Sequence, residues 1–132
     1  MKGKPRRLKL PAISEEMKAW SAALAAEIAD WPNVVTKPFF GFTALYRGVK
    51  LFGLLPRTRA MQTPNSLVFK LESPGPQAQA RMQRDSRVGE AIMQKARWFT
   101  FELSSDADLH DALAWLGRGY EAAGKRKRCA AN

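Results

Sequence analysis

The first pattern of apolar and polar residues follows Ser14 and predicts an amphipathic helix. Its apolar positions recur every three or four residues and so share one helix face: Met17, Trp20, Leu24, Ile28 and Trp31. Ser14 is a suitable N-cap, and Glu15 and Glu16 fall in the first turn, where the helix dipole favours acids. Pro32-Asn33 is expected to end the helix.

After residue 33 the pattern becomes that of β-strands. We expect strands at residues 34–36, 42–46, 49–55, 67–71 and 98–103. The second and third are joined at Arg47-Gly48. A type I turn with a bulge at Gly48 fits better than a type I′ turn, which would require a positive φ at Arg47.

Two further helical regions are expected in the second half of the chain. Pro74-Gly75-Pro76 is the strongest break, followed by helical composition at 77–84 and a short helix or turn at 89–94. Ser105 is expected to cap the last helix, which ends at Gly124. The first turn of this helix holds Asp106 and Asp108. Its apolar stripe is Leu109, Leu113, Leu116 and Tyr120.

This order of elements indicates an α+β fold with an antiparallel sheet of about five strands. The N- and C-terminal helices are expected to pack on one face of the sheet, leaving the other face to solvent or a partner. The expected organisation is a basic flexible arm at 1–12, a single domain at 13–124, and a basic flexible tail at 125–132.

The charge of the chain is concentrated at its two ends. The net charge is +10, yet residues 10–124 hold 13 basic and 12 acidic residues. The ends include these candidate contacts for an anionic partner: Arg6, Arg7, Lys125, Arg126, Lys127 and Arg128. Such ends are typical of solvated arms that aid solubility, and also of segments that contact nucleic acid or another polyanion. Both interpretations stay open.

A second candidate surface lies in residues 37–59, a stretch with no acid. Its basic residues are Lys37, Arg47, Lys50, Arg57 and Arg59. Arg47 and Lys50 are expected to be exposed beside the hairpin turn, while Arg57 and Arg59 follow the next strand after Pro56. Lysine and arginine so placed could follow a phosphate backbone, because they displace its condensed counterions. The simpler interpretation is that these are solvated ends of strands.

Two other sets bear on the same question. Phe39, Phe40 and Phe42 could offer stacking faces to single-stranded nucleic acid, or could simply belong to the core. Another basic set has three-residue spacing and is expected to form one helix face: Arg81, Arg84 and Arg87. If that face lay beside the hairpin, the nucleic-acid interpretation would gain.

The sequence contains no catalytic or metal-binding constellation, so we expect neither a cofactor nor an enzyme. His110 is the single histidine and is expected to be a solvated helix residue; Cys129 is the single cysteine and lies in the expected tail. Phosphate-binding glycine motifs and the G-x-S-x-G motif are absent. Asp106, Asp108 and Asp111 are interpreted as acids that complement a helix dipole, with a divalent-cation site as the less favoured alternative.

The apolar segments are too short for a membrane span or a secretory signal peptide. No apolar run approaches the roughly 20 residues that span a bilayer. The basic start MKGKPRRLKLPAI lacks the apolar region of a signal peptide, because Lys9 and Pro11 interrupt it. A cytoplasmic protein without membrane insertion is therefore expected.

Three segments resemble the small α+β proteins of the TfoX N-terminal-like and MmcQ/YjbR-like families. KPFFGFTALYRGVKLFGLL at 37–55 is similar to their opening hairpin, and SLVFKL at 66–71 to their next strand. RWFTFELSSDADLHDALAWLGRGYEAA at 97–123 is similar to their closing strand and helix. The resemblance implies this fold and, through the label that MmcQ/YjbR-like proteins carry, DNA binding; no catalytic residue carries over.

The first functional hypothesis is a small non-enzymatic protein that binds an anionic partner, most simply nucleic acid. Its contacts would come from the two basic ends and from Arg47, Lys50, Arg57 and Arg59. The alternative is a module that binds a protein or a small ligand on the open sheet face, with ends that only aid solubility.

Overall fold

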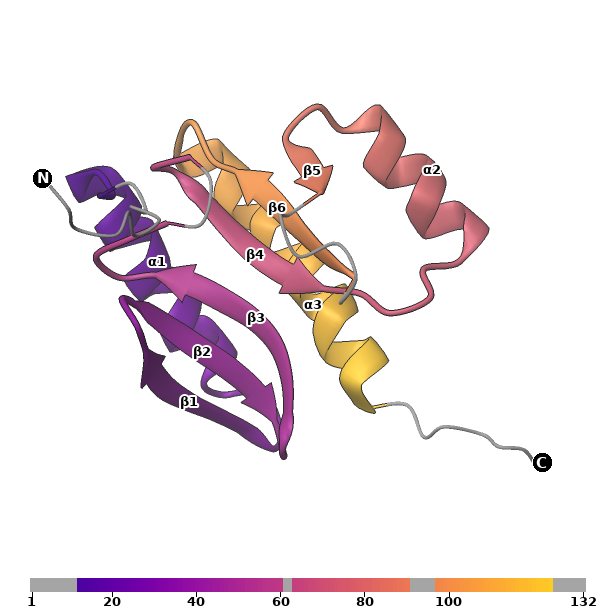
Figure 1. The fold of residues 1–132 in the computed structure, drawn as a ribbon, viewed down its shortest axis with the longest axis horizontal. Coiled ribbons are helices and arrows are strands. Elements are labelled where there is room, and N and C mark those ends of the chain that lie inside the picture. The colour runs from indigo at the N-terminus through magenta and orange to yellow at the C-terminus, as the bar shows by residue number, and fades with distance from the viewer. Residues whose placement is uncertain (1–11, 61–62, 91–96, 125–132) are drawn as a thin grey trace, which may run out of the picture.

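A computed structural model describes residues 12–60, 63–90 and 97–124 and has the expected α+β architecture (Figure 1). The helices in the described residues are α1 (Glu15–Ile28), α2 (Pro76–Arg84) and α3 (Leu109–Gly124), the last preceded by a 3₁₀ turn, η2 (Asp106–Asp108). The strands are β1 (Val34–Phe39), β2 (Phe42–Arg47), β3 (Lys50–Pro56), β4 (Ser66–Lys70), β5 (Val88–Glu90) and β6 (Trp98–Glu102). They form one antiparallel sheet in the order β1-β2-β3-β4-β6-β5.

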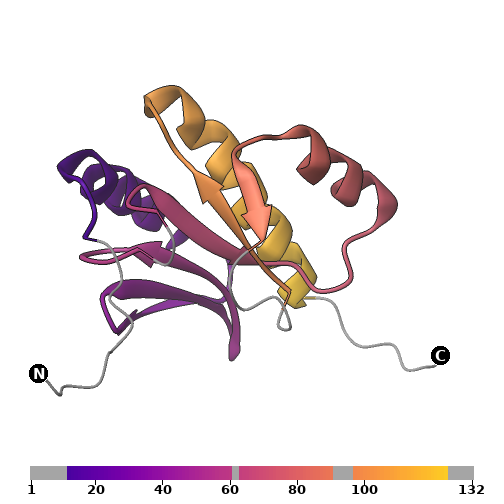
Figure 2. The same cartoon turned by 45° about the horizontal axis from the view of Figure 1, so that its top comes forward.

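The helices α1 and α3 lie on the same face of the sheet, as expected (Figures 1 and 2). Ser14 caps α1, since its Oγ accepts the Met17 N–H at 3.0 Å. The expected apolar face of α1 is confirmed at Met17, Trp20, Leu24 and Ile28, which are all buried. The helix ends at Ile28, before the expected stop at Pro32-Asn33, so Trp31 lies outside it and is half-buried.

The buried face of α3 is rotated relative to the expected stripe. Leu109 and Leu113 are only half-buried, and the buried residues of the helix are Ala112, Trp115, Leu116, Gly119 and Tyr120. A Cβ on Gly119 would lie 2.8 Å from the carbonyl oxygen of Lys70 and 3.2 Å from that of Phe52. The helix therefore meets the backbones of β3 and β4 at this glycine, which turns Trp115 inward.

The other sheet face is not open at its centre, contrary to expectation. A second apolar cluster lies there, and its members are between 0% and 5% exposed: Phe42, Ala44, Leu54, Val68 and Trp98. The sequence holds a signal for this. The runs Leu51–Leu55 and Leu67–Phe69 do not alternate with polar residues, a pattern typical of strands buried on both faces.

The β2–β3 hairpin turns differently from the prediction. Arg47 pairs directly with Lys50, so the loop is Gly48-Val49 rather than Arg47-Gly48. Gly48 has a φ of 65°, and a glycine with positive φ at the first loop position is the signature of a type II′ turn. The register shift occurs further along, between Leu45 and Tyr46, so the expected bulge at Gly48 is wrong.

The sheet gains a sixth strand where a helix was expected. Residues 88–90 form β5, which pairs with β6. The expected helix at 89–94 is therefore wrong at Gly89 and Glu90, and its remainder lies outside the described residues. A three-residue strand is too short to show an alternating pattern, and its pairing with β6 is a tertiary contact that local sequence does not encode. Beside it, α2 begins at Pro76, as the break at 74–76 predicts.

Candidate nucleic-acid interface

The turn between β1 and β2 exposes two aromatic side chains. Phe39 pairs with Phe42, so Phe40 and Gly41 form the two-residue loop. Phe40 is 84% exposed and Phe39 is 39% exposed, whereas Phe42 is buried in the second cluster. The rings of Phe39 and Phe40 meet edge to face, with centroids 4.9 Å apart. Of the three phenylalanines considered for stacking, the structure therefore exposes two.

The backbone of this turn is unfavourable for a phenylalanine. Phe40 and Gly41 have φ values of 45° and 88°, as a type I′ turn requires of both loop residues. Asn-Gly is the preferred pair in such a turn, and a bulky residue with positive φ is an outlier. Because the Phe40 ring is exposed, core packing does not compensate the backbone cost of about 1–3 kcal/mol.

Two exposed arginines lie directly against this turn. The carbonyl oxygen of Gly41 accepts the N–H groups of Arg57 at 2.9 Å, Thr58 at 3.0 Å and Arg59 at 3.4 Å. A Cβ on Gly41 would approach the Arg59 Cγ at 3.2 Å, which shows how closely the two segments pack. Ala12, at the end of the expected arm, also pairs with Arg59. We call Phe39, Phe40, Arg57 and Arg59 the hairpin-tip patch.

The chain around this patch is free of acids. Residues 31–71 hold no aspartate or glutamate, while they hold Lys37, Arg47, Lys50, Arg57, Arg59 and Lys70. The near balance of charge in residues 10–124 thus conceals a segregation, with the acids placed before and after the strands β1 to β4. A partner that approaches the hairpin-tip patch meets no acid from these strands. Among the described residues, the exposed acids near the patch are Glu15 and Glu16 of α1, which follow the Ala12–Arg59 pairing.

The four basic residues expected on the hairpin are divided between its two ends. Arg57 and Arg59 are exposed in the hairpin-tip patch. Lys50 is also exposed, but it lies at the opposite end of β3, beside Gly119 and Ala122 of α3. The length of β2 separates the two ends by roughly 17 Å. A single short contact site therefore does not include both.

Arg47 is not the free surface cation that the sequence suggested. Its Nη1 donates to the carbonyl oxygen of Tyr120 at 3.1 Å, and its guanidinium lies 4.1 Å from the centre of the Tyr120 ring. The guanidinium also lies against Gly124, at the C-terminus of α3. Arg47 thus acts as a positive cap for the last turn of α3, where the helix dipole favours cations. The prediction that it is exposed beside the turn is wrong.

The remaining predicted contacts fall outside the described residues. These are Arg6, Arg7, Lys125, Arg126, Lys127 and Arg128, and the same holds for Cys129.

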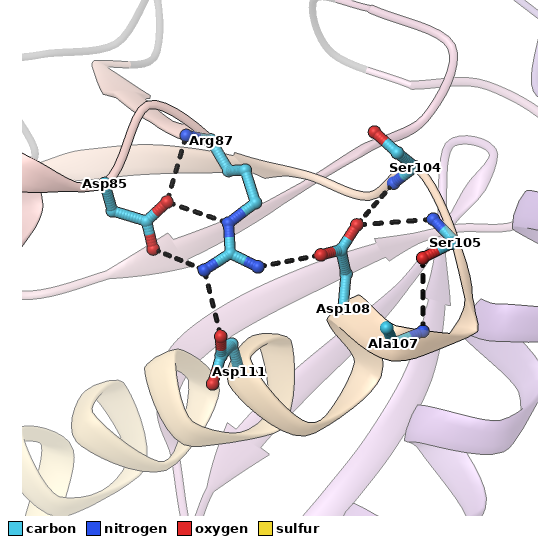
Figure 3. A network of polar contacts seen from close by, with 7 residues as sticks. All are labelled: Asp85, Arg87, Ser104, Ser105, Ala107, Asp108 and Asp111. Carbon is cyan, nitrogen blue, oxygen red and sulfur yellow. Dashed lines mark hydrogen bonds and ion pairs between the residues drawn. The ribbon is translucent and has the colours of Figure 1, made fainter.

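The basic residues Arg81, Arg84 and Arg87 do not share one helix face, although the sequence predicted that they would. Arg81 and Arg84 lie on α2, whereas Arg87 lies beyond the helix and pairs with acids. Arg87 follows α2 and donates to Asp85 (2.8 and 2.9 Å), to Asp108 (2.8 Å) and to Asp111 (2.9 Å) (Figure 3). The carboxylate of Asp108 also accepts the backbone N–H groups of Ser104 and Ser105. We call Arg87, Asp85, Asp108 and Asp111 the Arg87 network.

The ionisation of the Arg87 network follows from these contacts. The Arg87 hydrogen bond holds the pKa of Asp85 below its usual value, against a smaller opposing effect of burial. The Ser104 N–H, and after it Arg87, lower the pKa of Asp108. The three carboxylates in turn raise the pKa of Arg87, with Asp85 contributing most. Arg87 is the single cation for three carboxylates, so the network joins the segment after α2 to α3 and keeps an excess of negative charge.

The acids of the last helix serve different partners. Asp106 accepts the Trp20 indole N–H at 2.7 Å, while Asp108 completes a capping box with Ser105. His110 is exposed on α3. Among the described residues, no group of three or more His, Cys, Asp or Glu side chains has the arrangement of a metal site.

No helix in the described ranges has both the length and the apolar character needed to cross a membrane.

Comparisons of the chain with family models, curated proteins and solved structures found no match. The resemblance to the TfoX N-terminal-like and MmcQ/YjbR-like families therefore stays a prediction.

Proposed function

We propose that this chain is a cytoplasmic, non-enzymatic nucleic-acid-binding protein that holds a single-stranded segment on the hairpin-tip patch. One observation carries the proposal: Phe40 is 84% exposed in a backbone conformation that disfavours phenylalanine, beside two exposed arginines. Strained, exposed residues that folding does not require are typical of functional sites. The suggestive DNA-binding label of the MmcQ/YjbR-like families, which the sequence resembles, points the same way.

The chemistry of the patch suits an unpaired base and its phosphates. The faces of an exposed phenylalanine ring can stack with any base, whereas the bases of a duplex are already stacked on one another. Arg57 and Arg59 can donate to the adjoining phosphates and displace condensed counterions. Because none of these contacts reads the edge of a base, sequence preference is expected to be weak. The basic ends of the chain would add a further electrostatic attraction.

The proposal predicts that Phe40→Asn separates binding from stability. Asparagine suits the first position of a type I′ turn, so the free energy of unfolding is expected to be unchanged or higher. Loss of the ring removes base stacking of about 1–3 kcal/mol, which lowers the affinity for a short oligothymidine roughly five- to 150-fold. Fluorescence anisotropy of the labelled oligonucleotide and urea denaturation measure the two effects.

Val49→Asn is the matched control. Val49 is 91% exposed and lies in the Gly48-Val49 turn, at the other end of β2 from Phe40. The same apolar-to-amide change there is expected to leave the affinity unaltered. Equal affinities for the wild type and Phe40→Asn, or an equal loss with Val49→Asn, would refute the stacking role of Phe40.

A further inference from the structure

A hollow of about 730 Å³ lies between α2 and α3, away from the hairpin-tip patch. The two helices line it with the same spacing of residues: Ala80, Arg81 and Arg84 from α2, and Ala114, Trp115 and Arg118 from α3. In each helix an alanine and an arginine four positions apart share one face. The alanines leave space in the middle, and the arginines stand at its border.

The positive charge around this hollow exceeds the negative charge. Arg81 and Arg84 are exposed and Arg118 is half-buried, and none of them makes an ion pair with an acid among the described residues. Arg118 instead lies over the Trp115 ring, 5.2 Å from its centre. The two acids that border the hollow, Asp85 and Asp111, are both bound to Arg87. The lining thus holds four arginines against these two acids, and the three guanidinium groups outside the Arg87 network give the space an excess of positive charge.

Core packing holds α2 through only two side chains, the buried Ala78 and the half-buried Met82. This nine-residue helix buries only Ala78, and a helix so short is marginal in water by itself. The Arg87 network, formed directly after α2, ties its end to α3 (Figure 3). The Arg87 network therefore helps to position α2, whose exposed Arg81 and Arg84 line the hollow.

We propose that the hollow binds a small ligand with two or more linked phosphate groups, as in a nucleoside triphosphate. The planar guanidinium donates two parallel hydrogen bonds to phosphate oxygens, and three of them on two helices suit several linked anions better than one. The volume is within the range of small-molecule sites. The hollow lies near the β5 edge of the sheet, while the hairpin-tip patch adjoins the β1 edge. Ligand binding in the hollow is therefore independent of the nucleic-acid binding proposed for the patch.

Calorimetry with inorganic triphosphate and the full chain at physiological ionic strength tests this proposal. We expect saturable binding of one triphosphate per chain, weakened roughly ten-fold or more by Arg81→Gln/Arg84→Gln. Ala114→Leu fills the hollow without a change of charge, and since Ala114 is exposed the variant is expected to fold and to bind more weakly. Lys18→Gln/Lys37→Gln removes the same charge from exposed positions on α1 and β1, outside the hollow and the hairpin-tip patch, and is expected to leave binding unaltered.

Three results would overturn the proposal. Binding without saturation, or an equal loss in Arg81→Gln/Arg84→Gln and Lys18→Gln/Lys37→Gln, would show attraction by net charge alone. Wild-type affinity in Ala114→Leu would show that the hollow is not occupied. Absence of triphosphate binding, together with weaker oligothymidine binding by Arg81→Gln/Arg84→Gln, would assign these arginines to a nucleic-acid surface instead. The unfolding transition of each variant confirms that it is folded.

Discussion

Replacing Phe52 with alanine is expected to destabilise the protein by about 3–5 kcal/mol. Phe52 is fully buried in β3. Its ring stacks with that of Trp31, with ring centroids 6.5 Å apart, and meets the Tyr120 ring edge to face, with centroids 5.6 Å apart. Tyr120 in turn donates to the carbonyl oxygen of Pro32 at 2.8 Å. This aromatic cluster joins the segment after α1 to β3 and α3, so the cavity left by alanine would weaken all three.

The size of this effect is large relative to a typical domain stability of about 5–15 kcal/mol. Urea denaturation of the two variants Phe52→Ala and Phe40→Ala provides a matched comparison within one chain, because Phe52 is buried and Phe40 is 84% exposed. The exposed variant is expected to change the free energy of unfolding by less than about 1 kcal/mol. Similar losses in the two variants would contradict the burial described for Phe52.

The second large effect is expected from Arg87→Met, which leaves the carboxylates of the Arg87 network without their cation. The side chains of Asp85 and Asp108 are each only 16% exposed, so two nearly buried anions would lose their compensation. We expect a loss of about 2–4 kcal/mol at pH 7, somewhat less than for a fully buried pair. Arg84→Met, three residues earlier and without an acidic partner among the described residues, is the control and is expected to have little effect.

The pH dependence of this loss has a defined sign. The pKa of Asp85 in the folded protein lies below the usual 3.8, so its pairing with Arg87 stabilises the fold above about that pH. As the pH falls through the lowered pKa, protonation removes this contribution. The difference in unfolding free energy between wild type and Arg87→Met should therefore shrink from pH 7 to pH 3. A difference that stays constant or grows would contradict the network.

Local signals were sufficient to predict where the helices begin. Ser14 caps α1 and Ser105 caps the turn before α3, because a side-chain oxygen accepts backbone N–H groups whatever packs nearby. The break at Pro74-Gly75-Pro76 likewise marks the start of α2, since proline presets the φ of the first helical residue.

Features that depend on distant parts of the chain were not predictable in this way. Arg47 contacts Tyr120, 73 residues later, so its loss as a surface cation has no local signature. The Arg87 network equally joins residues that are 21 and 24 positions apart. The strand β5 was missed for another reason: it pairs with the next strand, β6, but its three residues are too few to show an alternating pattern.

The hairpin-tip patch combines a feature with a local sequence signal and a feature that depends on strand pairing. Phe40-Gly41 follows a strand and precedes another, which is a turn position where asparagine would be usual. The prediction from sequence does not use this mismatch and leaves Phe40 open between a stacking face and the core, whereas the structure exposes it. The position of Arg57 and Arg59 beside it required the pairing of β2 with β3, which returns the chain from Pro56 to the β1–β2 turn.

The most direct test is the salt dependence of oligothymidine binding by full-length variants. Arg57→Gln/Arg59→Gln is compared with the wild type and with the tail variant Lys125→Gln/Arg126→Gln/Lys127→Gln/Arg128→Gln. The logarithm of the affinity falls with the logarithm of the salt concentration, and each lost phosphate contact should reduce the steepness of this fall by about 0.7. The Arg57→Gln/Arg59→Gln variant should therefore lose about 1.4 of the slope. The tail variant should retain the part of the slope that is due to Arg57 and Arg59. An unchanged slope in Arg57→Gln/Arg59→Gln, with binding abolished in the tail variant, would show that the folded surface is not the nucleic-acid site.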